Sequence, residues 1–284
     1  MPASPAPRSF PASRPVPLHV DVPFANLYVV ASERDEAVVT VLPTTPGKSG
    51  SMKATEEIVV EQDGDAISVT YPGAWKQWVL PFAAGTADIT VELPTGSGVS
   101  GKTGSFRAEG ELGIVDLTLS AGDVRVEAAE RVFVKLAAGS AVIGRAGVLN
   151  VRSSAGSVRV DEAADGAIKA SNGTITLGRV TGSLQVTGSN GDVVVDVVRG
   201  DLAVKSAHGG IRVGSVERGS ARVATSYGSI EVGVPEGTAA YLDVSSEHGA
   251  LRNQLAPAEG PAGDEASAEI HATTGYGDII IRRP

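Results

Sequence analysis

The sequence contains no cysteine, few aromatic residues, no excess of basic residues and no long apolar run. Without cysteine, disulfide bonds, thiolate catalysis and cysteine-based metal sites are excluded. The formal net charge of −9 removes the attraction that drives binding to nucleic acid and to anionic lipid, so we expect neither partner. No segment approaches the ~20 apolar residues of a membrane span, and residues 1–17 hold no apolar stretch of secretory length. We therefore expect a cytoplasmic protein, with export to the cell surface without a leader left open.

The composition favours thin layers of aliphatic side chains. Aromatic residues make up only 4% of the chain, so the core must be built from Val, Ile, Leu and Ala. Glycine, at 35 of 284 residues, exceeds its usual share of roughly 7% and follows no collagen-like triplet. The chain therefore requires glycine at recurring positions.

A short sequence motif recurs about every nine residues from Gly173 to Val232. It consists of a glycine followed by a strand with alternating aliphatic residues, as in Gly191-Asp-Val-Val-Val195. One series of glycines defines the full period, at Gly104, Gly122, Gly139, Gly156, Gly173, Gly191, Gly209, Gly228, Gly249 and Gly277. A second series lies about midway between them, so each period carries two strands and two turns. The sequence predicts an all-β fold, a parallel β-solenoid with about 17–19 residues and two main strands per coil.

The alternation within each strand predicts which side chains face the core. Val193 and Val195 should point inward and Val194 outward, and the other coils should follow the same register. Equivalent strands of successive coils should lie about 4.8 Å apart. We expect the closing strand, residues 277–281, at the end of the stack.

Three further regions are predicted outside the regular repeat. Residues 1–17, rich in Pro, Ala and Ser, predict a disordered tail. Residues 18–98 predict a β-rich N-terminal segment, either a cap or the first irregular coils, and residues 99–284 predict the solenoid, with a mobile acidic loop at 253–269. Residues 44–54 are predicted to form a loop, and no segment shows the period of a helix. The short strands predicted in the N-terminal segment cover residues 27–30, 37–42, 57–61, 66–70 and 88–93.

Several of these sequence motifs resemble those of a known family. Ser171-Asn-Gly-Thr-Ile, Ser189-Asn-Gly-Asp-Val, the closing Gly277-Asp-Ile-Ile-Ile281 and the approach Ile89-Thr-Val-Glu-Leu-Pro-Thr-Gly-Ser97 are similar to the bacterial β-strand-repeat "putative adhesin" domain, a domain of unknown function. The resemblance covers roughly residues 20–284. It implies a β-solenoid and supplies no catalytic residues.

The turn position before the first glycine series is the strongest candidate interaction edge. It holds Asn172, Asn190, His208, Tyr227, His248 and Tyr276. Because coils stack, these side chains should form one row, which could bind a sugar, a metal or a partner. The alternative is that they tolerate the turn geometry and cap it by hydrogen bonding. His208 and His248 should lie two coils apart, about 10 Å, too far to share an ion.

A second candidate is an aromatic patch. Trp75, Trp78 and Phe82 lie together in a chain that is otherwise poor in aromatic residues. They predict either a contact loop or a plug at one end of the β structure.

No motif predicts a catalytic residue, a cofactor site or a metal site. Acyltransferases built on hexapeptide repeats need aliphatic residues every six positions, whereas here Val193, Leu202 and Ile211 recur every nine. A calcium-binding nonapeptide array needs a recurring Gly-Gly-x-Gly-x-Asp pattern, and only scattered Gly-Asp pairs occur. We expect a non-enzymatic scaffold with an unknown protein partner or self-association. The alternatives are an adhesin-like module that binds a protein or glycan through its turn edge or aromatic loop, and, more distantly, a carbohydrate-active enzyme.

Overall fold

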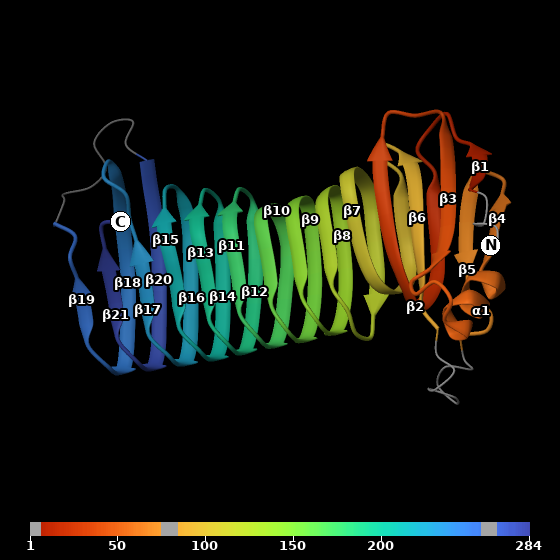
Figure 1. The fold of residues 1–284 in the computed structure, drawn as a ribbon. Helices are drawn as coiled ribbons and strands as arrows, with labels where there is room; N and C mark the ends of the chain where they lie inside the picture. The colour runs from red at the N-terminus through yellow and green to blue at the C-terminus, as the bar shows by residue number, and fades with distance from the viewer. Residues whose placement is uncertain (1–6, 75–84, 257–265) are drawn as a thin grey trace. The chain divides into compact units, whose positions relative to one another are not determined.

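The computed structural model describes residues 7–74, 85–256 and 266–284, and the chain divides into two compact units, Met1–Ile143 and Gly144–Pro284 (Figure 1). The predicted all-β class is confirmed, because the described residues form strands with a single short helix. Trp75, Trp78 and Phe82 lie outside the described residues, so the aromatic patch stays a prediction.

The first unit is a mixed β structure. Its long strand β2 pairs in parallel with β5, β6 and β7, and β7 pairs in parallel with β8. The pairs β1–β3, β3–β6 and β4–β5 are antiparallel. Each of the five short strands predicted between residues 27 and 93 overlaps one of β2 to β6, although the one predicted at 57–61 begins two residues before β4, where Glu57 still belongs to the helix. The elements are β1 (Arg8–Pro11), β2 (Pro17–Ser32), β3 (Glu36–Pro43), α1 (Ser49–Glu57), β4 (Val59–Asp63), β5 (Ala66–Thr70), β6 (Ala87–Pro94), β7 (Gly98–Leu119), β8 (Val124–Ala138) and β9 (Ala141–Ala155), which continues into the second unit.

Two expectations for this unit are wrong. The predicted loop at residues 44–54 contains the start of α1, whose buried residues Ser51 and Ala54 are too small and too few to give a helical hydrophobic pattern. Residues 8–11, expected in the disordered tail, form β1 and pair with residues 36–39 of β3. Backbone pairing along β3 orders this segment without any apolar pattern of its own.

The second unit consists of two rows of parallel strands. In one row β10, β12, β14, β16, β20 and β18 are neighbours in that order. In the other, β10 is followed by β11, β13, β15, β17, β21 and β19. The elements are β10 (Val158–Asn172), β11 (Ile175–Val180), β12 (Ser183–Asn190), β13 (Val193–Val198), β14 (Asp201–His208), β15 (Ile211–Val216), β16 (Gly219–Tyr227), β17 (Ile230–Gly233), β18 (Thr238–His248), β19 (Leu251–Asn253), β20 (Ala266–Tyr276) and β21 (Ile279–Arg282).

The predicted inward and outward positions are confirmed. Val193 and Val195 are buried, whereas Val194 between them is partly exposed. The equivalent residues of β11, β15 and β17 are buried as well, and valines such as Val198 fill the corner before the mid-coil glycine. The core of this unit is therefore a thin aliphatic layer between the two rows of strands.

Glycine is required at the turns for two reasons. Gly209 has φ +134°, a conformation that other residues rarely adopt. A Cβ atom built on it would also lie 2.2 Å from the carbonyl oxygen of Gly191 in the neighbouring coil. The same approach recurs from Gly173 to Gly277, so these glycines form a column in which backbones touch directly.

The order of the last coils differs from the expected order. The closing strands β20 and β21 lie between β16/β17 and β18/β19, so the segment that precedes them in the sequence is the outermost coil (Figure 1). Leu242 and Val244 of β18 point toward the core but are only half-buried, because β18 pairs with β20 alone among the described strands. Part of the predicted acidic loop is also strand, because β19 ends at Asn253 and β20 begins at Ala266; residues 257–265 lie outside the described residues.

Candidate functional site

The predicted turn residues form one continuous row, which we call the turn ladder. The backbone registers pair Asn172 with Asn190, Asn190 with His208 and His208 with Tyr227. They then pair Tyr227 with Tyr276, and Tyr276 with His248. Each residue is the last of its strand, where the chain leaves the row for the glycine turn. The six candidate residues are therefore brought together.

Neighbouring members of the turn ladder contact one another. Nδ2 of Asn190 donates to Oδ1 of Asn172 at 3.1 Å. The His208 and Tyr227 rings stack with centroids 5.0 Å apart and planes 4° apart, and the Tyr227 and Tyr276 rings with 5.1 Å and 5°. His248 stacks on Tyr276 at 4.5 Å. Part of each ring is thus covered by its neighbours.

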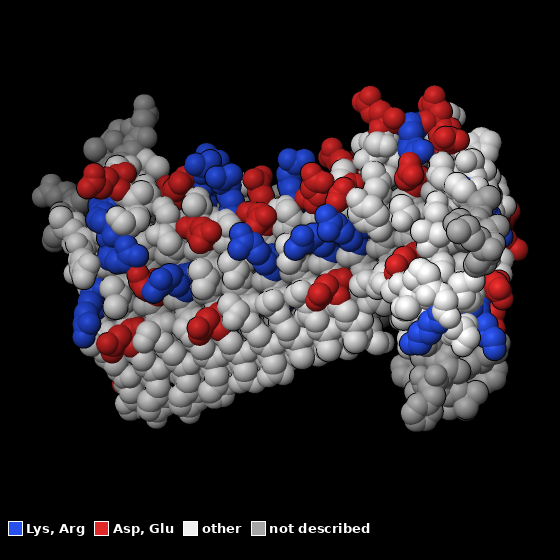
Figure 2. All heavy atoms as spheres, in the orientation of Figure 1, with Lys and Arg blue, Asp and Glu red and all other residues white. Residues whose placement is uncertain are grey.

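The turn ladder nevertheless presents an accessible, uncharged edge. Tyr227 and Tyr276 are each 51% exposed. Figure 2 shows charged side chains over the upper part of the strands of this unit, whereas the lower edge, where the turns after β12, β14 and β16 lie in Figure 1, is uncharged in that view. The edge can offer hydroxyl, imidazole and amide groups to a neutral partner.

The insertion of β20 corrects the expected spacing of the histidines. His208 and His248 are three steps of the ladder apart, not two, which is about 14 Å at the spacing of parallel strands. The conclusion that they cannot share a metal ion is unchanged. Within the described residues, no group of three or more His, Cys, Asp or Glu side chains is arranged to hold a metal.

Several of the scattered Gly-Asp pairs join adjacent coils. Oδ1 of Asp192 accepts the backbone N–H of Gly210 at 2.8 Å, and Oδ1 of Asp278 accepts that of Ala250 at 2.9 Å. In the first unit, Asp123 accepts both the hydroxyl and the backbone N–H of Ser140, and these hydrogen bonds, the hydroxyl first, lower the pKa of its carboxyl group. These aspartates act as turn clamps between coils.

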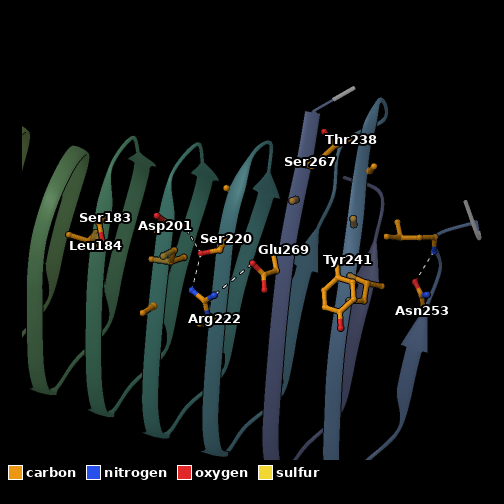
Figure 3. A pocket seen from close by; sticks show the side chains of 18 of the residues that line it. Ser183, Leu184, Asp201, Ser220, Arg222, Thr238, Tyr241, Asn253, Ser267 and Glu269 are labelled. Carbon is orange, nitrogen blue, oxygen red and sulfur yellow. Dashed lines mark hydrogen bonds and ion pairs between the residues drawn. The ribbon is translucent and has the colours of Figure 1, made fainter. Parts of the chain in front are cut away.

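A second polar arrangement crosses the outer face of β14, β16, β20 and β18 (Figure 3). Ser220 donates from Oγ to Oδ1 of Asp201 at 2.7 Å and accepts from Nη1 of Arg222 at 3.2 Å. Nη2 of Arg222 lies 3.7 Å from Oε2 of Glu269. Glu269 in turn contacts His271, which makes the chain of contacts continuous across three strands.

His271 lies between two carboxylates. Its Nε2 is 2.6 Å from Oε1 of Glu269, and its Nδ1 is 3.2 Å from Oδ2 of Asp243 on the neighbouring strand. The hydrogen bond with Glu269, followed by that with Asp243, raises the pKa of His271 above its usual value. Protonated, the ring donates to both carboxylates and so bridges β20 and β18.

This outer face borders an open groove of about 1430 Å³. Five of its residues occupy one register position on five adjacent strands, and we call them the groove row: Ser183, Asp201, Ser220, Glu269 and Tyr241. The Tyr241 side chain is the most exposed large hydrophobic group of the described residues, at 65%. This groove could not be predicted from the strand pattern, because Glu269 reaches the row only through the insertion of β20 between β16 and β18.

These features define an all-β repeat protein whose parallel strands carry two continuous rows of polar side chains. No described helix has the length and apolar character needed to cross a membrane. The chain belongs to the Toastrack DUF4097 family, whose profile matches residues 25–282. The resemblance inferred from the strand and turn phrases is thereby confirmed.

The solved structures that match the chain have low sequence identity and low TM-scores. A "putative adhesin" from Bacteroides fragilis is 13% identical over 97% of this chain and 96% of that chain, with a TM-score of 0.35. A "putative adhesin" from Parabacteroides merdae is 10% identical over 98% and 95%, with a TM-score of 0.33. A "putative lipid binding protein" from Parabacteroides distasonis is 12% identical over 100% and 98%, with a TM-score of 0.30. No curated protein matches the chain. Likenesses at these TM-scores identify neither a ligand nor an activity.

Proposed function

We propose that the chain is a non-enzymatic interaction scaffold, a parallel β-solenoid with 17–19 residues and two main strands per coil whose repeated surface is its working part. The observation that carries this proposal is that its potentially reactive side chains contact adjacent coils. Asp192 and Asp278 bind backbone N–H groups of adjacent coils, and Tyr227 is stacked between His208 and Tyr276. A catalyst needs such groups aimed at a substrate, whereas here they hold coil to coil.

The partner of such a scaffold is either a second copy of the chain or another protein. The outermost coil, β18 and β19, supports self-association, because its core-facing Leu242 and Val244 are half-buried and Leu251 is 51% exposed. Light scattering over a wide concentration range, with electron microscopy, tests this form of the proposal. Growth in mass with concentration supports self-association; a stable monomer without filaments at high concentration rules it out.

A second candidate function is a binding module that recognises its partner through the turn ladder. The four stacked rings from His208 to His248, with both tyrosines half-exposed, favour it. A glycan array and a panel of purified surface proteins, probed with the wild type and with the double variant Tyr227→Ala, His208→Ala, provide the test. Binding lost in the double variant supports this function, and binding that is absent or unchanged contradicts it.

The cytoplasmic location expected from the sequence stays a prediction. Fractionation of the native cells, with the chain detected in cytosol, envelope and medium, tests it directly.

A further inference from the structure

We propose that the groove row, Ser183, Asp201, Ser220, Glu269 and Tyr241, binds a neutral, linear oligosaccharide across the strands. This inference rests on the proposed interaction function and names a ligand class for a surface that is separate from the turn ladder.

The register of the groove row suits a ligand with a regular repeat. Its five residues lie on β12, β14, β16, β20 and β18, which are successive neighbours in one sheet. Adjacent strands are about 4.8 Å apart, so the row spans roughly 19 Å. Four of its members are exposed, whereas Ser220 is 5% exposed and holds Asp201 and Arg222 in place. The step between adjacent strands is comparable to the rise of a pyranose unit along an extended oligosaccharide. One sugar unit can therefore face each strand.

The charge of the groove favours a neutral ligand. Its described lining contains two carboxylates, Asp201 and Glu269, and two guanidinium groups, Arg222 and Arg283. The charges balance, so neither a polyanion nor a polycation gains a net attraction. Hydroxyl groups, which both donate and accept, can satisfy carboxylates and guanidinium groups alike.

The polar side chains of the groove are held in place before a ligand arrives. Ser220 links Asp201 to Arg222, and Arg222 is paired with Glu269. A carboxylate has about four acceptor positions and a guanidinium five N–H donors, so each group retains capacity for a ligand. Because these side chains are already ordered, binding costs less conformational entropy than it would on a flexible surface.

Tyr241 supplies the apolar contact that a sugar ring requires. It stands at the outer end of the groove row, is 65% exposed, and meets His271 only in a tilted arrangement with centroids 6.3 Å apart. An exposed aromatic ring of this kind packs against the C–H face of a pyranose while its hydroxyl group stays in water. The other members of the row supply hydroxyl and carboxylate groups along the strands on one side of it.

The same geometry disfavours an extended peptide. Peptides add to sheets through a free edge, whereas β14, β16 and β20 are each paired with a strand on both sides. A peptide added to β18, which pairs with β20 alone among the described strands, would run along the sheet edge and not across the groove row. Recognition at this face must therefore use side chains, and the exposed side chains of the groove row are polar apart from the Tyr241 ring.

Isothermal titration of the full chain with neutral hexasaccharides tests the proposal. The probes are cellohexaose, maltohexaose, mannohexaose, xylohexaose and chitohexaose, with tetragalacturonate as an anionic comparison. We expect one-site binding of at least one neutral probe. Tyr241→Ala and Glu269→Gln should each weaken that binding by about tenfold or more, which corresponds to about 1.4 kcal/mol. Circular dichroism checks that these surface variants remain folded.

Two matched variants separate this groove from other causes. Tyr241→Phe keeps the ring and should retain most of the affinity. Lys169→Ala, at an exposed position of β10 outside both the groove lining and the turn ladder, should leave it unchanged. The proposal is overturned if no neutral probe binds, if only tetragalacturonate binds, or if Tyr241→Ala and Glu269→Gln bind as tightly as the wild type.

The measurements distinguish a wrong assignment of the saccharide groove from a wrong proposed function. Release of new reducing ends from a bound probe would contradict a non-enzymatic scaffold while leaving the groove assignment intact. Absence of saccharide binding, with a partner captured through the turn ladder or through self-association, would contradict the groove assignment alone.

Discussion

Replacing Gly209 by alanine tests whether the coils touch through their glycine turns. Gly209 has φ +134°, and its built Cβ atom would lie 2.2 Å from the carbonyl oxygen of Gly191. Forcing alanine into such a backbone conformation costs about 1–3 kcal/mol. The clash requires one coil to move by more than about 1 Å, since ordinary contact begins near 3.4 Å.

This displacement would weaken two hydrogen bonds. The N–H of Gly209 donates to the carbonyl oxygen of Tyr227 at 2.9 Å, and the N–H of Gly191 donates to that of His208 at 3.0 Å. At about 1 kcal/mol each, their loss brings the total to about 3–5 kcal/mol. Stabilities of native proteins are about 5–15 kcal/mol, so the variant should lose a large fraction of its free energy of unfolding.

The adjacent Gly210 is the matched control. It has no positive φ, and the nearest atoms to its built Cβ are 3.6 Å away. Gly210→Ala should change stability by less than about 1 kcal/mol, because alanine restricts the unfolded chain without a clash. Urea unfolding followed by far-UV circular dichroism compares the two variants. Equal effects at the two positions would refute the column of touching backbones.

Three further changes test other parts of the structure by the same unfolding assay. Val195→Asp buries a carboxylate in the aliphatic layer and should lower the free energy of unfolding by more than about 4 kcal/mol. Val194→Asp, at an outward position, should lower it by less than about 1 kcal/mol. Equal losses would contradict the register. Asp192→Ala should lower the free energy of unfolding by about 1 kcal/mol, because it leaves the N–H of Gly210 without its acceptor. Asp192→Asn keeps an acceptor oxygen and should retain most of the wild-type stability. Equal stabilities of the two variants would refute the turn clamp. The raised pKa of His271 stabilises the fold at pH values below its unfolded pKa, and this contribution is lost as pH rises through the folded value. Stability should therefore fall more steeply in the wild type than in His271→Gln as pH rises above about 6.5, the usual pKa of histidine. Parallel profiles would contradict the bridge.

The repeat and its register could be predicted because each follows from local chemistry. Alternation of aliphatic residues identifies Val193 and Val195 as core residues, and the glycine spacing sets the length of a coil. The same spacing identifies Tyr227 and His208 as neighbours in a row, since stacking places equivalent turn positions together.

The order of the last coils could not be predicted because it depends on pairing between distant strands. Each of β18 and β20 is a suitable neighbour for β16 by pattern alone, and only the longer glycine steps, from Gly228 to Gly249 and on to Gly277, mark the irregularity. The structure shows that β20 is the strand adjacent to β16. The groove row was missed for this reason, since Glu269 and Tyr241 join Ser220 only in that order.

The short helix α1 escaped prediction for a different reason. Its sequence, Ser49-Gly-Ser-Met-Lys-Ala-Thr-Glu-Glu57, buries only Ser51 and Ala54, and a polar segment with small buried residues carries no periodic signal. The backbone of the helix at Gly50 passes close to Gly85. A Cβ atom on Gly85 would lie 1.9 Å from the carbonyl oxygen of Gly50. Tertiary contact, not local propensity, accounts for this helix.

The insertion of β20 between β16 and β18 is the feature on which both polar rows depend, and the absence of cysteine allows a direct measurement of it. Ala224, Thr273 and Ser245 occupy one register position on β16, β20 and β18, with Thr273 paired to each of the other two. Adjacent parallel strands, about 4.8 Å apart, allow a disulfide, whereas strands two steps apart, about 10 Å, do not. Under mild oxidation, the double variant Ala224→Cys, Thr273→Cys should form an intramolecular disulfide and Ala224→Cys, Ser245→Cys should not. The reverse result would place the coils in sequence order and contradict the account.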